Sequence, residues 1–181
     1  MNHLSELQIQ KLLKLSDEYE RALYLVSILF ANKKDKAGLP YINHLIRVSI
    51  NVNEKNTKVA ALLHDTVEDI ENFTFDDLKA LGFNEEVISL VKWVTKDKYD
   101  KEYTQEEKKE IYHKKITSII ESGNIEAVRL KYADMSDNFD EERLSRLDID
   151  TQNKLKNKYA NEIIRLEKYL KERNILWEKL K

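Results

Sequence analysis

The segment VAALLHDTVED, residues 59–69, decides the fold class of this chain. Five apolar residues lead into His64 and Asp65, and Glu68 and Asp69 follow one turn later. We interpret the segment as one buried helix, in which an advance of about 100° per residue brings the four polar side chains to one side. Burying an imidazole beside three carboxylates is costly unless a positive charge compensates. A bound divalent cation would supply that charge.

Helical spacing of apolar residues recurs along most of the chain, which has only three Gly and one Pro in 181 residues. A β-rich fold normally needs more turn residues than that. We therefore predict an all-α fold of roughly seven to nine helices, forming one domain over residues 1–181. Three of the expected helices have both ends defined, at 17–30, 105–121 and 125–138. The others are defined by their starts: one is opened by Pro40, one is capped by Thr57, one is capped by Thr74 and ended by Gly82, one starts at Asn84, and one starts at Thr151. Loops are expected at 32–39, 96–103 and 139–150.

Composition excludes several classes of protein. The formal net charge of −2 argues against a general nucleic-acid binder, which usually has a basic excess. The chain has no cysteine, so any metal must be bound by His, Asp or Glu. No apolar run approaches the length of a membrane span, and the first ten residues do not resemble a signal peptide. We expect a cytoplasmic protein.

Two further polar residues lie in apolar helical stretches. His44 is in YINHLIRVSI, residues 41–50, and Asp134 is in AVRLKYADMSDNF, residues 127–139. Either residue alone has an ordinary explanation, because a core histidine is commonly hydrogen-bonded and a helix-interior aspartate is commonly paired with Lys or Arg. Together with His64 and Asp65, they predict a metal site of two imidazoles and two carboxylates. Such a set suits Mn²⁺, Fe²⁺ or Zn²⁺.

The remaining histidines have polar neighbours in the sequence. His3 lies in the first few residues, and His113 lies among lysines. We expect both to be solvated surface residues.

The pattern H…HD…D resembles the signature of the HD phosphohydrolase superfamily. Its segments are similar in particular to the hydrolase domain of the RelA/SpoT alarmone enzymes and their small stand-alone relatives. The similarity runs from about Ala22 to about Leu170 and is carried by GLPYINH (38–44), AALLHDTVED (60–69), LVKWVTKDK (90–98) and KYADMSDN (131–138).

This resemblance implies a role for each residue of the site. One divalent metal, with Mn²⁺ expected and Fe²⁺ or Zn²⁺ as alternatives, would be bound by His44, His64, Asp65 and Asp134. Glu68 and Asp69 match the family's catalytic acidic pair. The nucleotide would contact Lys33, Lys34, Asn138 and Tyr159. The chain departs from the family at Lys33, where an arginine is usual, and in the acidic segment that follows Asn138.

The implied reaction removes the 3′-pyrophosphate of a guanosine alarmone, giving GDP or GTP and pyrophosphate. The partner would be this small nucleotide, with no nucleic acid and no membrane. Two alternatives remain: an HD-type nucleotidase or NADPH 2′-phosphatase, and a non-catalytic module that senses a nucleotide or neutralises a toxin. The intact acidic pair argues against the second, because a binding module has no need of it. Oligomeric state and regulation are not determined by the sequence.

Overall fold

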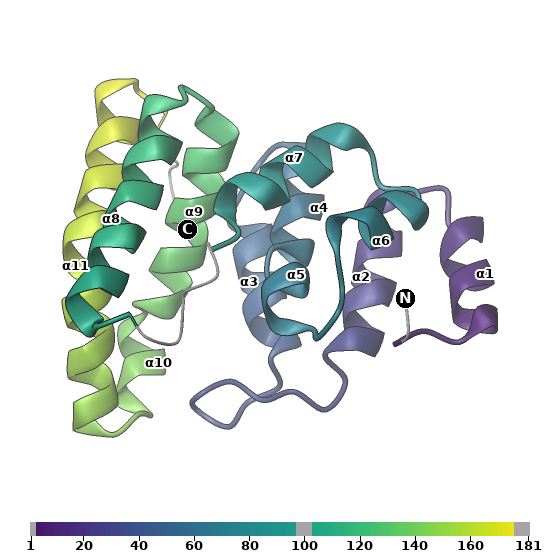
Figure 1. The fold of residues 1–181 in the computed structure, drawn as a ribbon, viewed down its shortest axis with the longest axis horizontal. Helices are drawn as coiled ribbons and strands as arrows, with labels where there is room; N and C mark the ends of the chain where they lie inside the picture. The colour runs from purple at the N-terminus through teal and green to yellow at the C-terminus, as the bar shows by residue number, and fades with distance from the viewer. Residues whose placement is uncertain (1–2, 97–102, 176–181) are drawn as a thin grey trace. The chain divides into compact units, whose positions relative to one another are not determined.

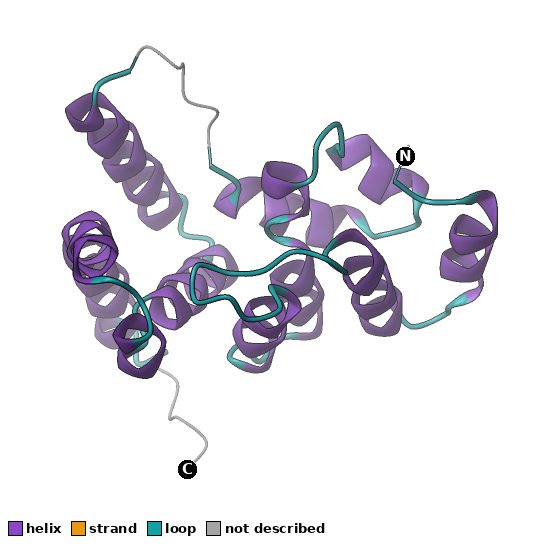
Figure 2. Cartoon of the chain, turned by 90° about the horizontal axis from the view of Figure 1, so that it is seen from below, coloured by secondary structure: helices purple, strands orange, loops and turns teal. Residues whose placement is uncertain are grey.

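A computed structural model describes residues 3–96 and 103–175 of the chain. Within these ranges all the regular elements are helices (Figure 2), and the single isolated β-bridge joins Lys34 to Pro40. The predicted all-α fold class is therefore confirmed. The contacts divide the chain into two compact units, Met1–Thr95 and Lys96–Lys181, which are described separately below. That residues 1–181 form one domain stays a prediction.

The first unit is built around one helix whose second half is apolar on every side. This helix, α4, has Val59 to Leu63 fully buried, and it packs against α2, α3 and α7 (Figure 1). A helix that is hydrophobic all round belongs in the middle of a core, which explains why the run before His64 shows no polar face. The helices of the unit are α1 (Glu6–Lys14), α2 (Glu18–Leu29), α3 (Ile42–Ile50), α4 (Lys55–Leu63), α5 (Thr66–Asp69), α6 (Phe75–Ala80) and α7 (Glu85–Val94).

The segment 59–69 is not one continuous helix, which corrects our interpretation. Helix α4 ends at Leu63, the backbone turns at His64 and Asp65, and the four-residue helix α5 follows. Both turn residues are buried, whereas Asp69 is exposed. The break therefore separates two buried candidate ligands from the acidic pair that follows them.

Two predicted helix starts in this unit were also wrong. Thr57 does not cap α4, because the chain is still extended at Glu54 and the helix begins at Lys55, leaving Thr57 buried inside it. Pro40 does not open α3, because its backbone pairs with Lys34 and the helix begins two residues later. By contrast, Thr74 and Asn84 cap α6 and α7 as predicted.

The second unit contains α8 (Gln105–Glu121), α9 (Ile125–Asn138), α10 (Glu141–Ser145) and α11 (Ile149–Glu172), and α8, α9 and α11 pack on one another (Figure 1). Helices α8 and α9 have the predicted bounds. The predicted loop 139–150 contains α10, and α11 starts earlier than expected because its cap is Asp148 rather than Thr151.

The helix count exceeds the prediction. The described residues form eleven helices, because α1, α5 and α10 were not expected as separate elements. Of the predicted loop 96–103, residues 97–102 lie outside the described ranges. None of the described helices combines the length and the hydropathy that crossing a membrane requires.

Candidate metal centre in the first unit

Three predicted metal ligands meet where α3, α4 and α5 come together. His44 is on α3, His64 follows α4, and Asp65 precedes α5; their exposed fractions are 1%, 3% and 5%. One ligand atom from each lies within 4.8 Å of those of the other two. Three side chains that were selected from the sequence are therefore buried and close together.

The spacing of these atoms fits a single ion. Asp65 Oδ2 lies 3.1 Å from His64 Nε2 and 3.6 Å from His44 Nε2. Nitrogen and oxygen ligands bound to one ion at about 2.1 Å lie roughly 3 to 4 Å apart, so both distances are compatible with a shared metal. Imidazole and carboxylate also form the donor set expected for Mn²⁺, Fe²⁺ or Zn²⁺.

The orientation of His64 favours metal binding. Its Nδ1 lies 2.7 Å from the carbonyl oxygen of Ala61, which can only accept a hydrogen bond. Nδ1 therefore bears the proton, and in the neutral ring the Nε2 lone pair faces Asp65. This backbone contact is a common way in which proteins fix the tautomer of a metal-binding histidine.

Tyr41 is a site residue that the sequence analysis missed. Its hydroxyl donates a 2.5 Å hydrogen bond to Asp65 Oδ2, the atom nearest both histidines. Its ring stacks on Phe30, with centroids 5.2 Å apart, and meets the His44 ring edge-on. The spacing of Tyr41 three residues before His44 places both on one face, but its contact with Asp65 depends on the tertiary fold.

The predicted acidic pair lies beside the predicted basic loop. Lys33 Nζ is 2.8 Å from Asp69 Oδ2 and 4.8 Å from the centre of the Tyr41 ring. The Lys33 carbonyl also accepts a hydrogen bond from the Tyr41 N–H, which holds the loop against the start of α3. Glu68 is partly buried. Tyr41 thus contacts a candidate metal ligand, Asp65, and a cation, Lys33, which in turn contacts Asp69 of the acidic pair.

Lys34 takes a different position from Lys33. Its backbone pairs with Pro40, and the residue is exposed. Asp35 stabilises the loop between Lys34 and Pro40, because its side chain accepts hydrogen bonds from the N–H groups of Ala37 and Leu39. Gly38, which lies between these two residues, has a φ of 79°, a backbone conformation that favours glycine.

The remaining candidates lie in the second unit. Asp134 is buried on α9, and its Oδ2 is 3.0 Å from Lys131 Nζ, the ordinary pairing that the sequence left open. Asn138 donates a 2.7 Å hydrogen bond to Asp134 Oδ1. Arg143, which the sequence analysis did not select, contacts Asp137 Oδ2 at 2.6 Å and Asn138 Oδ1 at 3.2 Å. It places a basic group beside Asn138 despite the acidic segment between them.

One further candidate, Tyr159, and one further histidine, His113, also lie in this unit. Tyr159 is buried on α11 and meets the Tyr112 ring edge-on, with centroids 5.8 Å apart. His113 is half-exposed, and its Nδ1 lies 2.7 Å from Glu162 Oε1. His113 therefore takes part in a helix-to-helix contact in addition to facing solvent.

Comparison with known proteins agrees with the motif. The model of the HD domain family matches residues 22–140. A guanosine-3′,5′-bis(diphosphate) 3′-pyrophosphohydrolase of Aquifex aeolicus is 35% identical over 127 residues, which cover 68% of this chain and 17% of that protein. The human enzyme of the same name, MESH1, is 43% identical over 72 residues, covering 36% of this chain and 39% of MESH1. The chain thus spans well under half the length of either relative.

A solved structure extends the similarity to the fold. It belongs to a metazoan ortholog of SpoT that is described as hydrolysing ppGpp. It matches 90% of this chain and 98% of its own, with a TM-score of 0.62 and 25% sequence identity. The family match covers well over half of the sequence and includes the motif residues His44, His64, Asp65 and Asp134. The chain belongs to the HD domain family.

Proposed function

We propose that the chain is a metal-dependent hydrolase that removes the 3′-pyrophosphate of guanosine alarmones, giving GDP or GTP and pyrophosphate, in the cytoplasm. The observation that carries this proposal is the buried group His44, His64 and Asp65, with the acidic pair and Lys33 next to it. The choice of substrate is supported by the names of the relatives, which share 35% to 43% identity with parts of the chain.

The metal would be one divalent ion, and we propose Mn²⁺. His44, His64 and Asp65 would hold it, and Asp134 is proposed as the fourth ligand on the strength of the sequence pattern. When bound, such an ion supplies positive charge to a phosphoryl oxygen and makes a water molecule more acidic. A site of imidazoles and carboxylates suits this role, because both kinds of donor bind divalent first-row metal ions.

The chain's own residues would orient the reactants. Glu68 and Asp69 would place the attacking water and accept its proton, the ordinary task of carboxylates in hydrolysis. Lys33 already lies 2.8 Å from Asp69, and its ammonium can turn to a phosphate oxygen when the substrate enters. Lys34, Asn138 and Tyr159 are proposed nucleotide contacts, with Asn138 directed at the sugar.

The test is turnover of a nucleotide panel with each of Mn²⁺, Fe²⁺ and Zn²⁺, in which pyrophosphate and orthophosphate are measured separately. We expect pyrophosphate from ppGpp and pppGpp, with the highest rate in Mn²⁺. Orthophosphate as the sole product would assign the protein to the nucleotidases or the NADPH 2′-phosphatases. Binding of nucleotide without any product would indicate a sensing or antitoxin module.

A further inference from the structure

Lys131 is a buried cation in the second unit with no role in the proposed chemistry. It lies on α9, its side chain is 2% exposed, and its Nζ is 3.0 Å from Asp134 Oδ2. Lysine is rarely buried to this extent, because its ammonium loses its hydration and has to be paired. Buried ion pairs are often no more stabilising than apolar side chains of similar size. Stability alone therefore does not explain why Lys131 is there.

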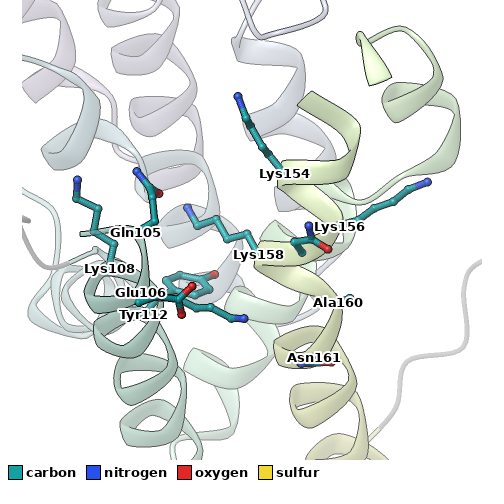
Figure 3. A pocket seen from close by; sticks show the side chains of 11 residues that line it. Gln105, Glu106, Lys108, Tyr112, Lys154, Lys156, Lys158, Ala160 and Asn161 are labelled. Atoms are coloured by element: carbon teal, nitrogen blue, oxygen red, sulfur yellow. The ribbon is translucent and has the colours of Figure 1, made fainter. Parts of the chain in front are cut away.

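The surroundings of Lys131 keep its ammonium beside Asp134. Its Nζ also lies 5.8 Å from the centre of the Tyr112 ring of α8, which is itself buried. Lys158 reaches the same ring from α11, with its Nζ 5.1 Å from the ring centre (Figure 3). This second ammonium disfavours a movement of Lys131 toward α11, because like charges repel. The carboxylate on its own helix is thus the favourable side for the Lys131 ammonium.

The Asp134 carboxylate is held at both of its oxygen atoms. Lys131 contacts Oδ2, and the Asn138 amide donates a 2.7 Å hydrogen bond to Oδ1. The same amide nitrogen donates a 3.0 Å hydrogen bond to the Asp134 carbonyl, which fixes its own direction. Two donors on one helix therefore set the orientation of the carboxylate plane. Lone pairs remain for a further contact, because a carboxylate has about four acceptor sites.

We propose that Lys131 is a positioning residue, which holds the Asp134 carboxylate in the orientation that binds the divalent ion. This inference rests on the proposed function, in which Asp134 is the fourth ligand. Groups that hydrogen-bond a metal ligand orient it in advance, and their loss commonly weakens metal binding roughly 10- to 100-fold. The opposite effect would follow if the ammonium mainly repelled the ion or took its place on Oδ2. The sign of the effect of removing Lys131 is therefore decisive.

The experiment titrates Mn²⁺ into the metal-free, full-length protein by calorimetry, so its readout does not depend on turnover. Lys131→Met keeps an unbranched side chain but removes the charge, and we expect the affinity for Mn²⁺ to fall roughly 10- to 100-fold. Unchanged affinity would overturn the proposal. Higher affinity would also overturn it, because Lys131 would then compete with the ion.

Turnover at different metal concentrations provides a second readout. In Lys131→Met, the Mn²⁺ concentration that gives half of the maximal rate should rise by the same factor, while the rate in saturating Mn²⁺ recovers. A purely structural defect would not produce this split. A lower rate at saturation with an unchanged half-maximal concentration would contradict the positioning role.

Arg165→Met is the matched control. Arg165 pairs with Glu162 at 2.5 Å, also three positions apart on one helix, and the carboxylates of both pairs belong to side chains that are 9% exposed. Each variant leaves a buried carboxylate with one cation fewer, so both should lower the Tm. Only Lys131→Met should weaken Mn²⁺ binding. Equal weakening in both variants would assign the effect to a general loss of stability and overturn the proposal.

Asp134→Asn separates this inference from the proposed function. If Lys131 acts only through Asp134, the double variant Lys131→Met with Asp134→Asn should bind Mn²⁺ as weakly as Asp134→Asn alone. The double variant leaves neither charge of the pair buried alone, so this comparison holds even if Lys131→Met does not fold. A difference between the two affinities would overturn the positioning role and leave Asp134 as a ligand. Wild-type affinity in Asp134→Asn would instead remove Asp134 from the metal site, and the role of Lys131 with it.

Discussion

The helices at the candidate metal centre begin differently from those of the second unit. In the second unit every described helix starts with a side-chain cap, supplied by Thr104, Asn124, Asp140 and Asp148. Helices α3, α4 and α5, which position the candidate ligands and the acidic pair, start without one. The helices near the site therefore depend on packing for their stability, and their terminal side chains remain available for other contacts.

Aspartate shows the difference most clearly. Asp148 and Asp65 both stand at the N-cap of a helix, and Asp148 accepts the hydrogen bond of a backbone N–H, as this residue type usually does. The Asp65 carboxylate instead faces His44, His64 and the Tyr41 hydroxyl. A missing cap costs about 1 kcal/mol, so α5 is less stable than a capped helix would be, while the Asp65 carboxylate is directed at the site. Departures from local rules are expected at functional sites.

The buried carboxylates of the two units also differ in their neighbours. In the second unit, Asp134 contacts Lys131, and Glu162 contacts Arg165 at 2.5 Å. In the first unit, Asp65 Oδ2 contacts two imidazoles and a phenol, which are ordinarily neutral at pH 7. The carboxylates of the second unit thus contact lysine and arginine, whereas the Asp65 carboxylate contacts the side chains of the candidate metal centre.

The largest expected effect comes from removing a candidate ligand. His64→Ala should lose the metal and lower turnover on the order of a thousandfold or more, because the ion's charge is worth several kcal/mol in the transition state. Asp134→Asn should also lose metal if the second unit supplies the fourth ligand. Elemental analysis after dialysis measures both, with circular dichroism to check the fold.

Asp137→Asn is the matched control for this prediction. Asp137 is also a buried carboxylate on α9, but it contacts Arg143, and the variant should keep its metal. Full metal occupancy in Asp134→Asn would leave Asp134 with only its pairing to Lys131. Full occupancy in His64→Ala would remove the metal centre from the first unit altogether.

The acidic pair should give the next largest effect. Glu68→Gln and Asp69→Asn should each reduce kcat at least about 100-fold while keeping the metal, since general acid–base groups contribute on that scale. The exposed neighbour Glu71→Gln loses the same charge and should remain active. Near-normal kcat in both variants would show that the pair is structural, with Asp69 serving only to hold Lys33.

Removing the Tyr41 hydroxyl should have a smaller, more specific effect. A carboxylate oxygen has lone pairs for both a metal and a hydroxyl donor, so Tyr41 can orient Asp65 while Asp65 binds the ion. Tyr41→Phe should weaken metal binding by roughly 10- to 100-fold, as loss of a residue that orients a ligand usually does. Calorimetric titration of Mn²⁺ into metal-free protein measures this without turnover.

Tyr24→Phe removes the same atom away from the site and provides the control. The Tyr24 ring contacts Lys11 and lies outside the candidate centre. If Tyr41→Phe binds Mn²⁺ as tightly as the wild type, the hydroxyl does not support Asp65. If both variants weaken binding equally, the effect is a general loss of stability.

The sequence predicted the starts of several capped helices correctly, although it missed the capped helices α1 and α10 and placed the start of α11 too late. Helices α6 to α9 begin where Thr74, Asn84, Thr104 and Asn124 indicate, because a side-chain cap is a local interaction that local sequence reveals. At α3 and α4 the predicted starts failed, and the break at His64 was missed. No local cap exists at these helices, and the packing of distant segments sets their ends.

The same distinction applies to the site residues. His44, His64 and Asp65 were identifiable because polar groups in apolar helical stretches need an explanation. The roles of Tyr41 and Arg143 were missed because they depend on contacts with residues outside their own helical turn. The pairing of Asp134 with a lysine could be expected from the sequence, because Lys131 lies three positions earlier on the same helix face. The structure shows this ion pair.

The smallest predicted effect concerns a cap in the second unit and its dependence on pH. Hydrogen bonds from the Thr151 hydroxyl and backbone N–H hold the pKa of Asp148 below its usual value. A lowered pKa stabilises the folded state above the unfolded pKa, near 4, and that contribution is lost as pH falls through the folded value. The ¹³Cα shifts of residues 149–152 should therefore become less helical as pH decreases below about 4.

Asp148→Asn isolates this cap from the other carboxylates of the chain. Asparagine caps helices about as well as aspartate but does not titrate, so the first turn of α11 should keep its shifts at low pH. An identical loss of helical shifts in the variant would assign the change to other groups. A wild-type first turn that stays helical well below pH 3 would show that packing, rather than the cap, fixes the start of α11, as it does at α3 to α5.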